Sequence, residues 1–230
     1  MPLDLPDTAR RFDLVIFDCD GVLVDSERLQ NEVFVAMLRE IDIEITLEGM
    51  FEQFVGHSMA YCMARVEQML GRVPPADFLP RLQQRTFEAF RDGLQPVDGI
   101  GEALDRIALP TCVASGGDHD KIRYTLGHTG LWPRFEGRIF SVVDVPRAKP
   151  HPDVYLHAAA TMRVVPARCA VVEDTPVGVT AAVAAGMTVF GYARLTPAAR
   201  LAAAGAHRLF TDMRRLPELL ATPDATRAPA

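Results

Sequence analysis

The chain of 230 residues lacks the excess of basic residues that non-specific binding to nucleic acid requires. It carries 30 acidic and 24 basic residues, for a formal net charge of -6. We therefore expect no nucleic-acid partner. An anionic small molecule is compatible with this balance, because a few local cations or a metal ion can reverse the sign of the potential in one cleft.

Paired cysteines and long apolar runs are also lacking. The four cysteines form no Cys-x-x-Cys pair and have no histidine cluster beside them, so buried reduced thiols explain them better than disulfides or zinc. No apolar run is long enough to span a bilayer, and residues 1–7 do not resemble a signal peptide. We expect a cytoplasmic protein without a membrane partner, either a monomer or a small homo-oligomer.

Short apolar runs, most of them followed by a helical pattern, are what the sequence does contain. Runs that are apolar throughout suit strands buried on both faces, and their alternation with helices predicts a mostly parallel sheet. The fold class is therefore α/β, with a Rossmann-like parallel sheet flanked by helices. The runs lie at residues 14–17, 111–114, 139–141, 169–172, 188–192 and 207–210.

One long segment interrupts this alternation. From about residue 28 to residue 95 no strand pattern is convincing, and apolar residues recur at helical spacing. We interpret this segment as a helical subdomain inserted after the first strand. The predicted division is an α/β core of residues 10–26 and 96–222, a helical insert of residues 27–95, and a flexible polar tail of residues 223–230.

The first of four polar clusters, Asp18-Cys19-Asp20-Gly21, follows the first predicted strand. Ligands of open α/β sheets bind at this end of the strands. Residues two apart point to one side of an extended chain, so Asp18 and Asp20 would share one space. Two such carboxylates suit a hard ion such as Mg²⁺, or a nucleophile beside a general acid/base. An Asx turn that ends the strand is the alternative.

The second and third clusters contain Ser115 with Gly116, and Lys149. The glycine allows backbone N–H groups to approach an anion ahead of a helix, although a helix cap would look the same. Lys149 lies in a proline-rich turn before Asp153, which is expected to begin a helix. A lysine held there would balance the charge of carboxylates and phosphate, whereas a solvated surface lysine is the commoner case.

The fourth cluster, Glu173 and Asp174, follows the run at residues 169–172. Acidic residues at the end of a buried strand are costly unless they are paired or bind a metal ion. Asp174 is the natural second carboxylate for an ion held by Asp18. The alternative is a cap of the next helix through Asp174 or Thr175, and the two roles are compatible.

Together these clusters resemble the motifs of the haloacid dehalogenase superfamily, most of whose members are phosphatases. Residues 17–26 match the first motif almost letter for letter, and Ser115 and Lys149 match the second and third. Residues 172–178 match the fourth, with Thr175 where serine is usual. The insert resembles the small α-helical cap found in β-phosphoglucomutase-like, phosphoglycolate phosphatase-like and 6-phosphogluconate phosphatase-like members.

The resemblance implies a phosphatase that uses Mg²⁺ to hydrolyse a small phosphorylated metabolite, with a sugar phosphate favoured. Asp18 would attack phosphorus and form an aspartyl-phosphate. Asp20 would protonate the leaving oxygen and then activate the water that hydrolyses this intermediate. Asp18, the backbone carbonyl of Asp20, Asp174 and, directly or through water, Glu173 would hold the ion.

The resemblance also assigns the remaining site residues. Ser115 and the Gly116 amide would hold phosphoryl oxygens, and Lys149 would neutralise charge on Asp18 and the phosphoryl group. Gly56 and His57 lie where such caps project a substrate-specificity loop. An exposed histidine before a capped helix is an equally compatible interpretation of His57.

Three other functions compete with this expectation. Dehalogenases and phosphonatases lack the second aspartate of the first motif, which is intact here as Asp20. A sugar phosphomutase of the β-phosphoglucomutase type carries basic residues around the cap-loop glycine, where this chain has Val55 and Met59. A phospho-receiver or metal-binding module is the non-enzyme alternative, and only the family resemblance disfavours it.

Overall fold

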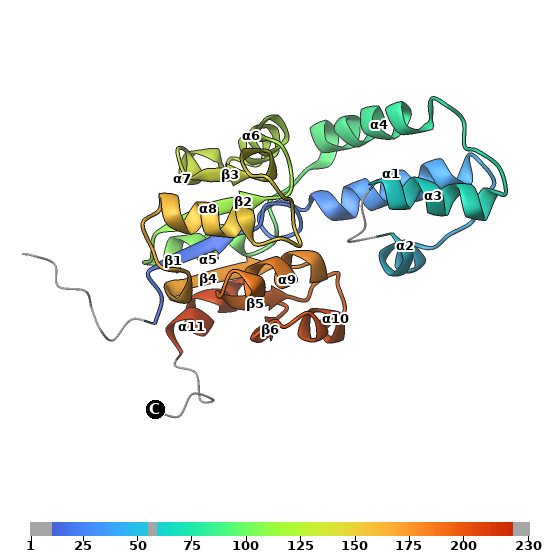
Figure 1. Ribbon diagram of the computed structural model, residues 1–230. Coiled ribbons are helices and arrows are strands. Elements are labelled where there is room, and N and C mark those ends of the chain that lie inside the picture. Colours follow the sequence, from blue (N-terminus) through green and yellow to red (C-terminus); the bar gives the residue numbers. More distant parts are fainter. Residues whose placement is uncertain (1–10, 55–58, 223–230) are drawn as a thin grey trace, which may run out of the picture.

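The computed structural model describes residues 11–54 and 59–222 (Figure 1). The predictions for Gly56, His57 and the tail at residues 223–230 lie outside these described residues. In Figure 1 a sheet with helices around it forms one lobe, and helices α1–α4 form a second lobe beside it.

The core is one parallel sheet of six strands in the order β3-β2-β1-β4-β5-β6. The predicted α/β fold is therefore confirmed, and each predicted apolar run agrees with one strand to within one residue. β1 lies between β2 and β4, so the carboxyl ends of these three strands are adjacent. The strands are β1 Leu14–Phe17, β2 Thr111–Ser115, β3 Ile139–Ser141, β4 Cys169–Glu173, β5 Thr188–Tyr192 and β6 Arg208–Phe210.

Helices cover both faces of this sheet. Val15 and Phe17 of β1 pack in one hydrophobic cluster with α5, α6, α7 and α11, while Leu14 and Ile16 pack in another with α8, α9 and α10. Burial on both faces explains why the strand sequences are apolar throughout. These helices are α5 Ile100–Arg106, α6 His119–His128, α7 Trp132–Phe135, α8 Asp153–Thr161, α9 Pro176–Ala184, α10 Ala198–Ala203 and α11 Leu216–Ala221.

The second lobe has a hydrophobic core of its own. Phe34 and Leu38 of α1 pack there with Val66 of α3 and with Phe78 and Leu82 of α4. A separate core supports the proposal that residues 27–95 form a cap subdomain, although its first helix already begins at Ser26. The four helices are α1 Ser26–Arg39, α2 Leu47–Gln53, α3 Met59–Leu70 and α4 Phe78–Gly93.

The two chain crossings between the lobes run side by side. Val24 and Pro96 form an antiparallel bridge, and the Asp25 N–H donates to the Gln95 carbonyl at 2.9 Å. Arg194, in the loop after β5, reaches the Asp25 carboxylate at 3.3 Å. The cap is therefore joined to the core by a short two-stranded ribbon that begins next to the end of β1.

The cysteines and the lengths of the helices agree with the sequence analysis. All four cysteines are buried and none is in a disulfide, as expected. None of the helices in the described parts of the chain is long and apolar enough to cross a membrane.

Candidate active site

Four of the predicted site residues meet at the carboxyl ends of β2, β1 and β4. Asp18 follows β1, Ser115 ends β2, and Glu173 ends β4. The Lys149 ammonium group donates to Asp18 Oδ1 at 2.6 Å, to Glu173 Oε1 at 2.8 Å and to the Ala114 carbonyl at 3.1 Å. Lys149 therefore ties the ends of three adjacent strands to one point.

Lys149 is a buried cation rather than a solvated surface lysine. Its side chain is 8% exposed, and the carboxylates of Asp18 and Glu173 are 9% and 1% exposed. Burial opposes its charged form, but the two carboxylates outweigh burial and hold the pKa of Lys149 well above its usual value. Burial, partly offset by Lys149, raises the pKa of Asp18 to about 7.

Both oxygens of Glu173 are already engaged by donors. Oε1 accepts from Lys149 and from the Tyr155 hydroxyl at 2.8 Å, and Oε2 accepts from the Asp174 and Thr175 backbone N–H groups and the Thr175 hydroxyl at 3.0 Å. A β-carbon at Gly178 would lie 1.7 Å from Oε1, so the first turn of α9 must carry a glycine here. In this arrangement Glu173 holds Lys149 in place.

Asp20 is held by a second lysine. The Lys121 ammonium donates to Asp20 Oδ2 at 2.9 Å, and the Ser26 hydroxyl donates to Oδ1 at 2.5 Å. Burial alone would raise the pKa of Asp20, but Lys121 and Ser26 reverse this effect and lower it. Asp18 and Asp20 thus share one site while each faces its own ammonium group.

Lys121 was missed by the sequence analysis, although a signal was present. Lys121 and Lys149 are the only lysines in the chain, and the other basic residues are all arginine. Lys121 lies in the first turn of α6, whose N-cap is Asp118. Lysine occurs at two positions of the chain, and at both its ammonium group contacts an aspartate of the first motif. The rarity of lysine therefore indicates that these two positions have a role in the site.

The loop after β2 is fixed by hydrogen bonds at Ser115 and Gly117. Ser115 is buried, and its hydroxyl accepts from the Gly117 N–H at 3.0 Å. The Gly117 carbonyl in turn accepts from the Ser141 hydroxyl at 2.6 Å. Apart from its two chain neighbours, no atom of the described residues lies within 4 Å of the place where a Gly116 β-carbon would stand, so this part of the structure leaves the loop open at Gly116. Ser115 is not a helix cap, because Asp118 has that role.

Asp174 faces a residue that sequence reasoning did not select, Glu27 in the first turn of α1. The Glu27 carboxyl group lies close enough to Asp174 to raise the pKa of Asp174. Burial raises the pKa of Glu27 to about 8 and the pKa of Asp174 well above its usual value. Thr175, not Asp174, caps α9, since its hydroxyl accepts from the Gly178 N–H at 3.1 Å.

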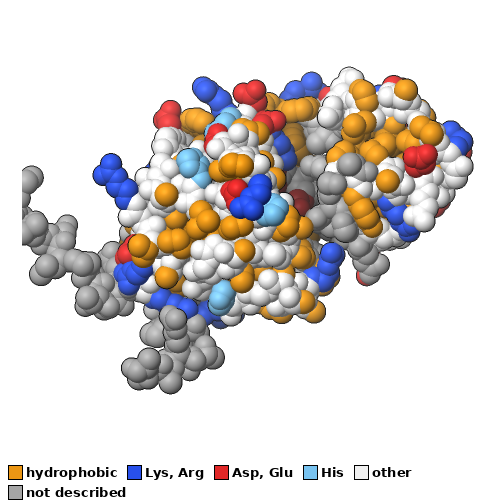
Figure 2. Space-filling model, viewed as in Figure 1, with side chains coloured by type: hydrophobic (Ala, Val, Ile, Leu, Met, Phe, Trp, Pro, Cys, Tyr) orange, Lys and Arg blue, Asp and Glu red, His pale blue; other side chains and the backbone are white. Residues whose placement is uncertain are grey.

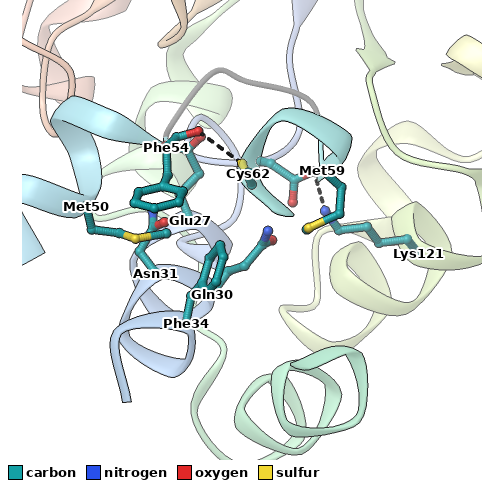
Figure 3. A pocket seen from close by; sticks show the side chains of 10 residues that line it. Glu27, Gln30, Asn31, Phe34, Met50, Phe54, Met59, Cys62 and Lys121 are labelled. Atoms are coloured by element: carbon teal, nitrogen blue, oxygen red, sulfur yellow. Dashed lines mark hydrogen bonds and ion pairs between the residues drawn. The ribbon is translucent and has the colours of Figure 1, made fainter. Parts of the chain in front are cut away.

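A pocket of about 220 Å³ opens from Asp20 and Lys121 into the cap (Figure 3). Its far wall is mostly apolar, and hydrophobic side chains are also frequent on the cap surface in Figure 2. Gln30 and Asn31 on α1 supply amide groups on one side. The described residues that line it are Asp20, Glu27, Gln30, Asn31, Phe34, Met50, Phe54, Met59, Cys62 and Lys121.

Known proteins resemble this chain over most of its length. Residues 12–186 match the family model described as haloacid dehalogenase-like hydrolase. The 6-phosphogluconate phosphatase of Escherichia coli (strain K12) is 32% identical over 91% of this chain and 95% of its own length.

Solved structures agree with this. A haloacid dehalogenase-like protein of unknown function from Agrobacterium tumefaciens superposes with a TM-score of 0.87 at 36% identity, covering 91% of this chain and 98% of its own. A HAD family hydrolase from Deinococcus radiodurans, solved with bound phosphate and sodium, gives a TM-score of 0.82 at 33% identity, covering 92% and 96%. The chain belongs to the haloacid dehalogenase-like hydrolases.

Proposed function

We propose that this phosphatase hydrolyses a small phosphorylated metabolite, a sugar phosphate in preference to others, in a Mg²⁺-dependent reaction. The observation that carries the proposal is the pairing of Asp18 with Lys149 and of Asp20 with Lys121 in one site. The second pair also lines the pocket. The printed activity of the E. coli relative, 6-phosphogluconate phosphatase, supports this class of substrate.

The chemistry assigned to the two aspartates is balanced and needs no other co-reactant than water. An Asp18 oxygen forms a bond to phosphorus while the ester P–O bond breaks, and Asp20 gives its proton to the leaving oxygen. Water then attacks the aspartyl-phosphate and gives a proton to Asp20. Inorganic phosphate leaves, and Asp18 is again a carboxylate.

The other residues position and neutralise the phosphoryl group. The Lys149 ammonium, already 2.6 Å from Asp18, would balance the charge that builds up on the phosphoryl oxygens. Ser115 and the Gly116 amide would donate hydrogen bonds to those oxygens. This agrees with the physics of phosphoryl transfer, in which positioning and charge stabilisation supply most of the catalysis.

The donors at the site fit Mg²⁺. Asp174 is 3% exposed and its Oδ1 has no hydrogen-bond partner, and the Asp18 carboxylate lies near enough to raise its pKa. No three His, Cys, Asp or Glu side chains within the described ranges are grouped for an ion, so the proposed set is these two carboxylates and the Asp20 carbonyl. Such hard oxygen donors are those Mg²⁺ prefers, and the ion would supply positive charge beside the phosphoryl group.

The pocket favours hydrolysis over the mutase alternative. A mutase must hold a second phosphate, which calls for cations far from the nucleophile. Of the described residues that line the pocket, only Lys121 is cationic, and it is bound to Asp20. A pocket of this kind would also have no purpose in a phospho-receiver, which supports an enzyme over a binding module.

A panel of phosphorylated metabolites assayed with Mg²⁺ tests the proposal. We expect phosphate release from 6-phosphogluconate or another sugar phosphate at least ~10-fold faster than from phosphoglycolate, which is too short to fill the pocket. Chelation of divalent ions should abolish the release. Glucose 6-phosphate formed from β-glucose 1-phosphate would show a mutase instead, and no turnover of any compound would show that the chain is not a phosphatase.

The amide of Gln30 provides a test of the pocket itself. Gln30→Ala should raise KM for a sugar phosphate by up to ~10-fold, the worth of one hydrogen bond, because its amide faces the space for the leaving group. The KM for acetyl phosphate, whose leaving group is small, should stay within about twofold. Gln83→Ala, on the exposed face of α4, is the matched control. Equal changes for both substrates would remove Gln30 from substrate recognition.

A further inference from the structure

Glu27 brings a carboxyl group from the first helix of the cap into the reactive centre. It lies in the first turn of α1, directly after Ser26, whose hydroxyl holds Asp20. The residue as a whole is partly exposed, but its Oε2 atom is buried and has no hydrogen-bond partner. A buried carboxyl oxygen without a partner costs folding free energy, so its presence indicates that a ligand binds there.

Asp174, directly after β4 in the core domain, also has a buried carboxyl oxygen without a hydrogen-bond partner. The residue is 3% exposed, and this oxygen is Oδ1. Of the charged neighbours of Asp174, Glu27 has the largest effect on its pKa, which it raises. Neither residue takes part in a salt bridge with Lys or Arg anywhere in residues 11–54 and 59–222.

The carboxyl groups of Asp174 and Glu27 both lie next to Gly21. A β-carbon there would lie 2.0 Å from Asp174 Oδ2 and 3.3 Å from Glu27 Oε2. Gly21 also has a φ of 76°, which favours glycine. Because Gly21 has no side chain, the space between it and the two carboxyl groups stays open.

The carboxyl groups of the centre outnumber the cations beside them. Among the described residues, Lys121 and Lys149 are the cations in contact with this group, which consists of Asp18, Asp20, Glu27, Glu173 and Asp174. Both lysines contact other carboxyl groups, so Glu27 and Asp174 have no cationic partner there, and burial raises the pKa of both. A divalent cation beside Asp174 would satisfy both.

We infer that Glu27 is a further carboxylate of the proposed Mg²⁺ site, contributed by the cap and acting beside Asp174. This inference rests on the proposed function. Mg²⁺ usually keeps several waters, so a carboxylate in the surrounding shell contributes to affinity without a direct bond. Because Glu27 belongs to α1, ion binding would also fix the first turn of the cap against the core.

Calorimetric titration with MgCl₂ tests this on three full-length variants. Glu27→Gln keeps the shape but removes the charge, and it should weaken Mg²⁺ binding by ~10-fold or more, as outer-shell changes do. Asp174→Asn should abolish measurable binding. Glu32→Gln removes a charge from the exposed side of the same helix and should leave the affinity within about twofold.

The outcomes separate this inference from the proposed function. An unchanged affinity in Glu27→Gln, together with lost binding in Asp174→Asn, would overturn the role of Glu27 alone. Unchanged affinity in both variants would overturn the ion site on which the proposed function depends.

Thermal unfolding with and without MgCl₂ distinguishes a role of Glu27 in ion binding from a purely structural role. Without Mg²⁺, Glu27→Gln should be at least as stable as the parent chain, since the variant lacks a carboxyl group whose charged form is disfavoured by burial. The rise in Tm on adding MgCl₂ should be smaller in the variant than in the parent. A variant that is destabilised without the ion and shows the full rise in Tm would overturn the inference.

Discussion

Asp18→Asn is expected to reduce kcat by at least ~10⁴-fold, because an amide oxygen is a poor nucleophile and loss of a nucleophile removes a whole reaction route. The change keeps the size of the side chain and its contact with the Lys149 ammonium. It also removes a charge that burial disfavours, since burial raises the pKa of Asp18 to about 7. We therefore expect the fold to remain intact, with a Tm close to that of the parent chain.

The measurement is phosphate release under saturating substrate and Mg²⁺, together with mass spectrometry of acid-quenched enzyme. The parent chain should carry a phosphoryl adduct on Asp18, and the variant should carry none. Asp42→Asn is a matched control, because Asp42 is exposed and its positive φ of 64° suits asparagine. A variant at Asp18 that retained most of the activity would show that the nucleophile is another residue.

Lys149→Ala is expected to have the second largest effect, and to act on both rate and stability. Loss of the ammonium group leaves the buried carboxylates of Asp18 and Glu173 without their counter-charge, which typically costs about 3–5 kcal/mol of folding free energy. The charge on the phosphoryl group in the transition state would be uncompensated as well. The loss in kcat/KM should exceed the loss in stability, at ~10⁴-fold or more, which is at least about 5.4 kcal/mol.

A double variant separates the two effects of Lys149. Adding Glu173→Gln removes one of the two stranded charges, so the double variant should regain part of the lost Tm. It should regain none of the rate, because the phosphoryl group still lacks its cation. Recovery of rate and Tm together would make Lys149 a structural residue. Glu136→Gln, an exposed carboxylate after α7, is the control for the added substitution.

The sheet could be predicted because each strand is a short run of apolar residues that is recognisable in the sequence alone. Leu14 and Ile16 face one hydrophobic cluster while Val15 and Phe17 face the other, so burial on both sides makes the run apolar at every position. The parallel order then places the ends of β2, β1 and β4 together, which is why residues as distant as Asp18 and Ser115 were assigned to one site.

The helical contributors to the site could not be found in the same way. Ser26, Glu27, Lys121 and Tyr155 act from the first turns of α1, α6 and α8, and their neighbours depend on how each helix is oriented against the sheet. Ser26 was recognised only as part of a motif. The scarcity of lysine was the one sequence signal that would have selected Lys121.

This scarcity has a spectroscopic consequence. Lys121 contacts Asp20 and Lys149 contacts Asp18, and the chain has no other lysine. Isotope labelling of the lysine side-chain nitrogen alone would therefore give an NMR spectrum with one signal from each of the two ammonium groups. One signal would report on the proposed nucleophile and the other on the proposed acid/base, so that each aspartate could be followed separately during turnover, in the intact chain and without any added probe.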